Sequence, residues 1–222
     1  MSIALKLLEF LVKGKLLKLG RQSCSDGRKA QLEVERKFCL SDDEYESLPE
    51  KLGSLGFTAA AAVEMTDTFL PTIDDKEMMR VRVEKGCCVS HVTLTAKSWF
   101  TTPDGGRERQ EAERQIAAAV GQALVLAGRL LAGSALLSLS KYRQMFVGKL
   151  SGLACVVSID QARELGQYSG CYLEVEILVP IGADVTPARE QIAAFARELL
   201  GDGREPVQLS YREMLKLSLQ EQ

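Results

Sequence analysis

The amino-acid sequence predicts an α+β protein in which charged β-strands close into a barrel and helices pack outside it. Two observations predict this fold. Several strand-like stretches alternate apolar and charged residues, so each strand has one charged side. The charges also come in same-sign pairs two residues apart, and a solvated sheet face gains nothing from placing like charges together. A closed barrel whose interior carries these charges accounts for the whole set.

The first and last of these strands carry paired carboxylates. The acids lie two residues apart and share a face of their strand: Glu33 and Glu35 in residues 32–38, and Glu174 and Glu176 in residues 172–177. Lys37 lies on the same face as the first pair. Four carboxylates repel one another unless a cation lies between them, and oxygen ligands of this kind suit Mg²⁺ or Mn²⁺. The two strands therefore predict an acidic metal site.

The strand-like stretches between these two carry mostly positive charge. The cations are Arg80 and Arg82 in residues 79–83, Lys97 in 91–97, and Lys141 and Arg143 in 140–146. The acids of this region are Glu111 and Glu113 in 107–115 and Asp160 in 156–160. Taken alone, each strand fits an ordinary sheet with one wet face. As a set, the strands predict a confined site for a ligand rich in negative charge, which a metal joins to the carboxylates.

The residues from Leu32 to Phe38 resemble the Glu-x-Glu-x-Lys signature of the CYTH superfamily. This superfamily, also called triphosphate tunnel metalloenzymes, includes thiamine triphosphatases, inorganic tripolyphosphatases and class IV adenylate cyclases. The resemblance runs from about Gln31 to about Tyr211. The remaining parts follow in the family's order: Asp67-Thr68-Phe69, Arg80-x-Arg82, a lysine strand, a Glu-x-Glu strand, Lys141-x-Arg143, an aspartate strand and Glu174-x-Glu176.

This resemblance implies a tunnel of eight antiparallel strands, with a charged lumen and helices outside, that binds a triphosphate lengthwise and uses Mg²⁺ or Mn²⁺. The cations that it assigns to phosphate are Lys37, Arg80, Arg82, Lys97, Lys141 and Arg143. It assigns Glu174 and Glu176 to the principal metal with Asp160 nearby, Glu33 and Glu35 to a second metal or to the attacking water, and Glu111 and Glu113 to balancing the cationic wall. Thr95 departs from the pattern, because many relatives have lysine there; Lys97 lies on the same face two residues further on.

We therefore predict a divalent-metal-dependent triphosphatase that acts on tripolyphosphate, thiamine triphosphate or a nucleoside triphosphate. The Glu35-Arg36-Lys37-Phe38 form of the signature resembles the triphosphatase members. Two alternatives stay open. One is an adenylate cyclase that converts ATP to cyclic AMP and pyrophosphate in the same tunnel, and the other is a module that holds polyphosphate or a nucleotide without turnover.

Composition excludes several other classes. The 222 residues, 46% of them hydrophobic, suffice for one domain with a core. A net charge of −2 lacks the basic excess of a nucleic-acid binder. The sequence has no P-loop motif, and its single histidine, His91, has no convincingly placed nucleophile for a catalytic triad. The six cysteines lack zinc-site spacing and predict reduced thiols in a cytoplasmic protein, which we expect to be a monomer or homodimer.

Residues 1–30 read as a separate extension before a tunnel domain that spans 31–222. The first twenty residues are rich in leucine and lysine and could form a basic amphipathic helix, which the lysines interrupt too often for it to span a membrane. An extension or a helix packed on the tunnel is the favoured interpretation, and binding to a surface or targeting to an organelle is the alternative. Residues 22–29 predict a linker.

Four helices are expected to form the scaffold. Their ranges are 41–55, where Ser41 is a helix cap, 117–137, broken near Gly128 and Gly133, 186–201, which Pro187 helps to start, and 210–219. Each has an apolar stripe at helical spacing or a helix-forming composition.

Overall fold

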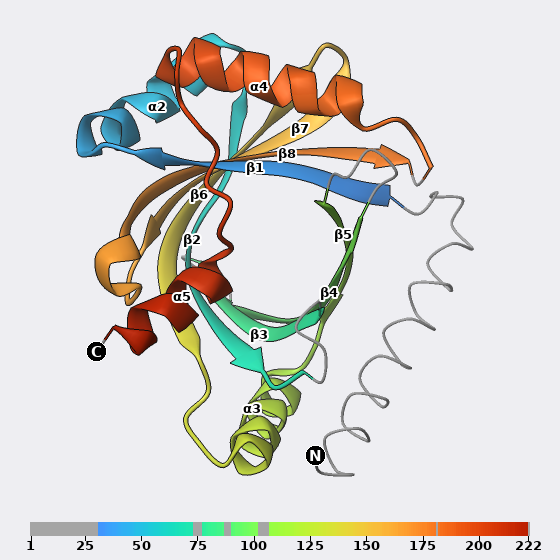
Figure 1. Cartoon of the computed structure of the whole chain (residues 1–222), viewed down its shortest axis with the longest axis vertical. Helices are drawn as coiled ribbons and strands as arrows, with labels where there is room; N and C mark the ends of the chain where they lie inside the picture. Colours follow the sequence, from blue (N-terminus) through green and yellow to red (C-terminus); the bar gives the residue numbers. More distant parts are fainter. Residues whose placement is uncertain (1–30, 73–76, 87–89, 102–106, 181, 222) are drawn as a thin grey trace. The chain divides into compact units, whose positions relative to one another are not determined.

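The structure, a computed structural model, describes residues 31–72, 77–86, 90–101, 107–180 and 182–221 (Figure 1). Within these ranges the protein is α+β, with an eight-stranded antiparallel sheet and four α-helices. The predicted strands and helices are confirmed, with one difference in the helix predicted over 117–137. The predicted extension and linker, 1–30, lie outside the described residues.

The elements follow one another along the chain without a repeat. They are β1 (Gln31–Leu40), α2 (Asp42–Ser54), β2 (Thr58–Leu70), β3 (Glu77–Lys85), β4 (Ser90–Thr101), β5 (Arg107–Gln115), α3 (Ala118–Ala132), β6 (Ser138–Leu150), β7 (Leu153–Ala162), the short 3₁₀ helix η2 (Gly166–Tyr168), β8 (Gly170–Pro180), α4 (Thr186–Leu200) and α5 (Tyr211–Gln220). The chain divides into two compact units. Among the described residues, unit 1 holds 31–32 and Thr66–Ser138, and unit 2 holds Glu33–Met65 and 139–221.

Unit 1 is built on an antiparallel meander of β3, β4 and β5. Arg80 pairs with Thr95, and Thr95 pairs with Glu113, so these three side chains lie on one face. The opposite face is apolar: Met79, Val81, Val92 and Leu94 form a buried cluster with Leu70. Helix α3 covers this face in Figure 1, and Leu124 and Val125 pack against the cluster. One face is thus a core and the other is charged.

Helix α3 differs from its predicted form. It runs unbroken through Gly128 and ends at Gly133, whose φ of 66° is the left-handed conformation that glycine favours at a helix end. Gly128 stays helical because the helix packs closely there. A Cβ at this position would lie 3.1 Å from side-chain atoms of both Leu70 and Leu136. The glycine therefore serves close packing, not a break.

Unit 2 repeats the two-faced plan with β6, β7 and β8. Its apolar face is fully buried at Val157, Ile159, Leu173, Val175 and Ile177, each 0% exposed. Burying such a side chain contributes about 1.5–3 kcal/mol. Helices α2 and α4 lie over this part of the sheet in Figure 1, where they bury Leu48, Leu52 and Ile192. The other face carries the charged residues of β6, β7 and β8.

The two N-caps of unit 2 explain where α2 and α5 begin. Ser41 accepts a hydrogen bond from the Glu44 amide, and the Glu44 carboxylate accepts one from the Ser41 amide. Ser210 and Glu213 repeat this arrangement at α5. Each pair satisfies two backbone donors that the helix itself cannot. Within the described residues, no helix combines the length and apolar character that crossing a membrane requires.

Candidate functional site

Three carboxylates of unit 2 converge. Glu33 and Glu35 from β1 and Glu176 from β8 each offer an oxygen within 4.8 Å of the others. Glu33 is buried and the other two are half-buried. The alternation of β1 places its two acids on one face, as predicted. Three oxygen donors this close suit a hard divalent cation such as Mg²⁺ or Mn²⁺, which would also offset their mutual repulsion.

A second cluster of unit 2 is a network of ion pairs centred on Asp160. This residue is 0% exposed, yet it accepts from Lys141 Nζ at 2.8 Å and from the Nε and Nη2 atoms of Arg143, both at 2.6 Å. Arg143 also bonds Glu174, whose Oε1 lies 3.4 Å from Lys37 Nζ. Four of the residues predicted to bind phosphate or metal thus meet around one buried carboxylate.

The two clusters divide the predicted metal ligands. Glu176 lies with Glu33 and Glu35, whereas Glu174 and Asp160 contact cations. The register explains the division, because Asp160 pairs with Tyr172, four residues along β8 from Glu176. The shared face of Glu174 and Glu176 is visible in the sequence, but the partner that each acid meets along that face is not. The metal role of Glu174 and Asp160 stays a prediction, and Glu33, Glu35 and Glu176 are the described acids that lie close enough together to share one ion.

Opposing effects act on the charges of this network. Burial raises the pKa of Asp160, but Arg143 and Lys141 outweigh burial, so the pKa lies below its usual range. Burial lowers the pKa of Arg143, but Asp160 and Glu174 outweigh that effect and raise it well above its usual value. Asp160 and Arg143 are therefore charged at neutral pH.

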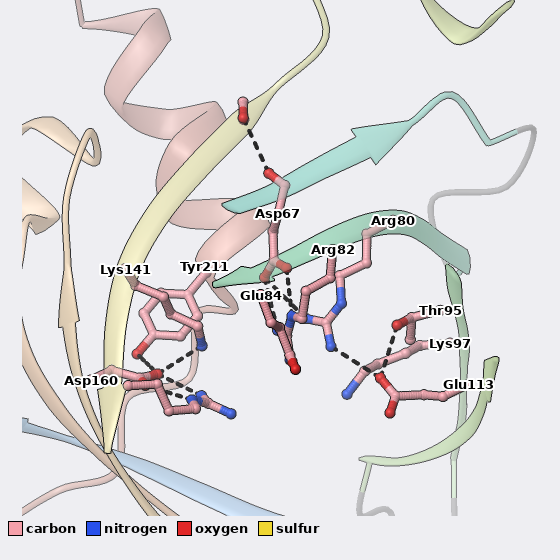
Figure 2. Close-up of polar contacts among 12 residues, drawn as sticks. Asp67, Arg80, Arg82, Glu84, Thr95, Lys97, Glu113, Lys141, Asp160 and Tyr211 are labelled. Atoms are coloured by element: carbon pink, nitrogen blue, oxygen red, sulfur yellow. Dashed lines mark hydrogen bonds and ion pairs between the residues drawn. The ribbon is translucent and has the colours of Figure 1, made fainter. Parts of the chain in front are cut away.

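Tyr211 joins this network, although no local pattern of the sequence assigned it a role. Its hydroxyl donates to Asp160 Oδ2 at 2.8 Å. Its ring centroid lies 3.5 Å from Lys37 Nζ and 4.7 Å from Lys141 Nζ. Figure 2 shows the phenol beside Lys141 and Asp160. The Ser210 cap could have indicated that Tyr211 starts a helix, but not what the ring contacts.

Unit 1 organises its cations around a different buried acid. Asp67, 2% exposed, accepts from Arg82 Nε at 2.7 Å and from Arg82 Nη2 at 2.9 Å (Figure 2). Arg80 Nη1 lies 3.3 Å from the same carboxylate. A planar guanidinium suits such two-point pairing, which fixes the direction of the side chain. In the sequence Asp67 is marked only as part of the Asp-Thr-Phe segment, and no local pattern predicts its contact with both arginines.

The acids of β5 lie against the cations of β3 and β4. Lys97 forms an ion pair with Glu111, its partner in the strand register. Arg80 Nη2 lies 3.8 Å from Glu111 Oε1 and 3.6 Å from Glu113 Oε1. Thr95, fully buried, donates to Glu113 Oε1 at 2.9 Å. Thr95, the position that departs from the family pattern, thus binds an acid of the neighbouring strand.

Glu113 holds its proton more tightly than an ordinary glutamate. Burial raises its pKa, and the neighbouring Glu111 carboxylate raises it further, while Arg80 and the Thr95 hydroxyl act in the opposite direction. The repulsion between the two acids therefore exceeds the relief that Arg80 gives to Glu113.

Comparison with known proteins agrees with the resemblance to the CYTH superfamily that the sequence showed. The sequence model of the CYTH domain matches residues 31–211. No curated protein matches the sequence significantly.

Three solved structures illustrate the similarity. A protein from Pyrococcus horikoshii OT3 is 23% identical, with a TM-score of 0.63, over 86% of this chain and 99% of that one. A candidate adenylate cyclase from Vibrio parahaemolyticus is 16% identical, with a TM-score of 0.58, over 85% and 99%. A candidate adenylyl cyclase from Hippeastrum with a dominant triphosphatase activity is 15% identical, with a TM-score of 0.56, over 84% and 95%. At these identities the likeness concerns the fold.

Proposed function

The chain belongs to the CYTH family, and from that premise we propose that it is a divalent-metal-dependent hydrolase of triphosphate-containing substrates. The observation that carries the proposal is the convergence of Glu33, Glu35 and Glu176 within 4.8 Å, in the same unit as a cluster of strand cations. A polyanion binder without metal chemistry has no need for three adjacent carboxylates, because they repel its ligand. The substrate class is inorganic tripolyphosphate, thiamine triphosphate or a nucleoside triphosphate.

The proposal includes the closure of the eight strands into a tunnel. The charged face of β3, β4 and β5 in unit 1 and that of β1, β6, β7 and β8 in unit 2 would line its lumen. Each charged face lies opposite an apolar face that helices cover, so both parts of the sheet already distinguish a core side from a polar side. A triphosphate lying lengthwise would then engage cations contributed by both units.

In this mechanism the protein supplies positioning and charge. Lys37, Lys141 and Arg143 of unit 2, with Arg80, Arg82 and Lys97 of unit 1, would bind the phosphate oxygens and offset the charge that develops as the bridging P–O bond breaks. Glu33, Glu35 and Glu176 would hold Mg²⁺ or Mn²⁺, which when bound neutralises phosphate oxygens. Glu35 or Glu33 would orient the attacking water in line. The products are orthophosphate and the shortened diphosphate.

Hydrolysis is preferred over cyclisation for two reasons. The Hippeastrum protein, which shares the fold, is described by its dominant triphosphatase activity despite its name as a candidate cyclase. The signature of this chain, Glu35-Arg36-Lys37-Phe38, also resembles the triphosphatase members of the family. The Vibrio protein, named as a candidate adenylate cyclase, keeps ATP cyclisation as the second candidate function.

The decisive experiment resolves products as well as rates. The full chain is incubated with tripolyphosphate, thiamine triphosphate or ATP, each with Mg²⁺ and with Mn²⁺, and the products are separated by ion-exchange chromatography. We expect orthophosphate from at least one substrate, and Glu35→Gln should lower its release much more than it weakens substrate binding, because water orientation matters mainly in the transition state.

Each other outcome names a different function. Cyclic AMP and pyrophosphate as the initial products from ATP, with tripolyphosphate intact, would replace the hydrolase with a cyclase. Tight binding of all three substrates without any product would indicate a binding module.

A further inference from the structure

The C-terminal helix contributes one aromatic side chain to the cation network of unit 2. Tyr211 is the first residue of α5 and is 8% exposed. The paired Ser210 and Glu213 bonds set the start of the helix, and hence the position from which the phenol extends. Tyr211 thereby contacts side chains that β1, β6 and β7 supply.

The hydroxyl of Tyr211 shares an acceptor with two cations. It donates at 2.8 Å to Asp160 Oδ2, the oxygen that also accepts from Lys141 Nζ at 2.8 Å and Arg143 Nη2 at 2.6 Å. Donors that share one oxygen compete for its lone pairs and for directions of approach. The phenol therefore restricts where Lys141 and Arg143 can lie and weakens the hold of Asp160 on each of them.

The ring of Tyr211 acts on a third cation. Lys37 Nζ lies 3.5 Å from the ring centroid, well within the range of a cation–π contact. Tyr172 fixes the ring from the side, with centroids 5.4 Å apart and planes at 86°. Lys37 thus has an aromatic face to lie against besides the Glu174 carboxylate at 3.4 Å.

The Tyr211 phenol stays protonated, so its hydrogen bond to Asp160 is retained. Burial raises the pKa of Tyr211 well above its usual value, and the Asp160 and Glu174 carboxylates raise it further. The phenol is accordingly protonated at neutral pH, where it donates to Asp160 Oδ2. It is not placed to act as a base.

Resting on the proposed function, we propose that Tyr211 is a positioning residue, which holds Lys37, Lys141 and, through Asp160, Arg143 in the arrangement that receives the phosphates. The helix that carries it is then part of the substrate site and not only scaffold. In this role Tyr211 acts through the cations and does not itself contact the substrate.

The test measures binding separately from turnover. Tripolyphosphate is titrated by calorimetry into the full chain without metal and with Mg²⁺, and initial rates are measured alongside. Tyr211→Phe removes the hydroxyl and keeps the ring, so we expect about a tenfold weaker affinity, the size of one hydrogen bond to a charged group. Tyr211→Leu also removes the π face and should weaken binding by a further factor of about three to five.

Leu215→Ala supplies the matched control. Leu215 is a buried residue of α5 that packs one turn beyond Tyr211. Its truncation should lower the melting temperature at least as much as Tyr211→Phe does, while the affinity measured well below that temperature stays within twofold of wild type. A loss of affinity in Leu215→Ala equal to that in Tyr211→Phe would mean that loosening α5 accounts for both, and the positioning role would fall.

A double-mutant cycle provides the readout that a merely structural role would not move. In a Lys141→Ala background, Tyr211→Phe should cost less than about threefold in affinity, because the cation that it positions is gone. In an Arg82→Ala background, where the lost cation is the one bound by Asp67 in unit 1, the cost should stay near tenfold. Equal costs in both backgrounds, or a Tyr211→Phe affinity equal to wild type, would overturn the proposal.

The two proposals fail in different ways. Wild-type protein that binds tripolyphosphate tightly but releases no phosphate from it, from thiamine triphosphate or from ATP contradicts the hydrolase and leaves the positioning role intact. Wild-type protein that hydrolyses tripolyphosphate, with Tyr211→Phe indistinguishable from it, contradicts only the positioning role. Protein that binds none of these three triphosphates contradicts both.

Discussion

Units 1 and 2 have the same arrangement of an apolar and a charged sheet face, and they differ in how the acids of the charged face are arranged. Each has an antiparallel sheet with a helix-covered apolar face and a charged face, and each binds its cations to a nearly inaccessible aspartate, Asp67 in unit 1 and Asp160 in unit 2. In unit 1 the acids Glu111 and Glu113 lie against the cations. In unit 2 three further acids, Glu33, Glu35 and Glu176, each offer an oxygen within 4.8 Å of the others.

This difference indicates that the two units have different roles, anion binding in unit 1 and metal binding in unit 2. In unit 1 the described carboxylates pair with the cations and hold them in place. We infer that the role of this unit is to bind an anion through those cations. Unit 2 combines a similar cation set with three adjacent carboxylates that suit a metal. If the proposed function holds, substitutions of the metal-binding acids of unit 2 should mainly lower turnover, whereas substitutions of the cations of either unit should weaken substrate binding as well as turnover.

The largest expected effect is on the metal set of unit 2. Glu176→Gln keeps the volume of the side chain and removes one anionic oxygen, so turnover should fall about a thousandfold, since a bound metal supplies several kcal/mol of charge stabilisation. Turnover is measured over a Mg²⁺ series, and Mn²⁺ binding is followed by electron paramagnetic resonance. Glu50→Gln, at an exposed acid of α2 in the same unit, is the control. Near-wild-type turnover of Glu176→Gln at limiting Mg²⁺ would remove Glu176 from the metal set.

The second effect compares the two buried aspartates. Asp160→Asn leaves Lys141 and Arg143 without their shared buried charge and should lower the free energy of unfolding by about 3–5 kcal/mol. Asp67→Asn should cost less, about 1.5–3 kcal/mol, because Arg80 keeps Glu111 and Glu113 nearby and Arg82 keeps Glu84, whereas Glu174 is the ion-pair partner that Arg143 keeps. Urea unfolding at neutral pH measures both. The reverse order would show that the two aspartates are not arranged as described.

The Asp160 effect should also depend on pH in one direction. Because the folded state lowers the pKa of Asp160, the stability that this carboxylate contributes is present above its unfolded pKa, near 3.8, and is lost as the pH falls through the lower folded value. The gap between wild type and Asp160→Asn should therefore narrow in acid. A gap that widens below pH 4 would contradict the sign of the shift.

The third effect tests the grip of each unit on the substrate. Arg80→Ala in unit 1 and Lys37→Ala in unit 2 should each weaken binding of tripolyphosphate by about 1–3 kcal/mol, the range for a lost charged contact. The loss should be larger than for orthophosphate, because a longer anion engages more cations at once. Titration calorimetry with both anions gives the comparison. Equal losses for the two anions would argue against a lengthwise tunnel.

The smallest effect concerns Glu113. Because the folded state raises the pKa of this acid, folding takes up a proton, and the contribution of Glu113 to stability declines as the pH rises from about 4.5 through the raised value. Glu113→Gln should remove that decline and gain less than about 1 kcal/mol over wild type at pH 7, since the side chain is half-exposed and screened. Urea midpoints at pH 4 and pH 7 measure it. A loss of stability at pH 7 would show that the pairing of Glu113 with Arg80 outweighs its repulsion by Glu111.

The sequence by itself determined which residues share a face. Alternation along a strand is local geometry, so the common faces of Glu33 with Glu35, of Arg80 with Arg82 and of Lys141 with Arg143 were predictable without any knowledge of the pairing. The helix start at Ser41 was equally local, because a cap satisfies backbone donors within its own first turn. The family resemblance added the expectation that eight antiparallel strands carry these residues.

Only the tertiary structure decided which charges meet. The partner of an acid depends on the register between strands, so the sequence could not show that Asp160 and Glu174, which are predicted to lie at the metal, contact Lys141, Arg143 and Lys37. The same holds for Asp67 with the two arginines and for Gly128, whose fit against Leu70 keeps α3 unbroken. Tyr211 reaches Asp160 across 51 positions of sequence. Contacts of that separation follow from how the elements pack, and no local pattern encodes them.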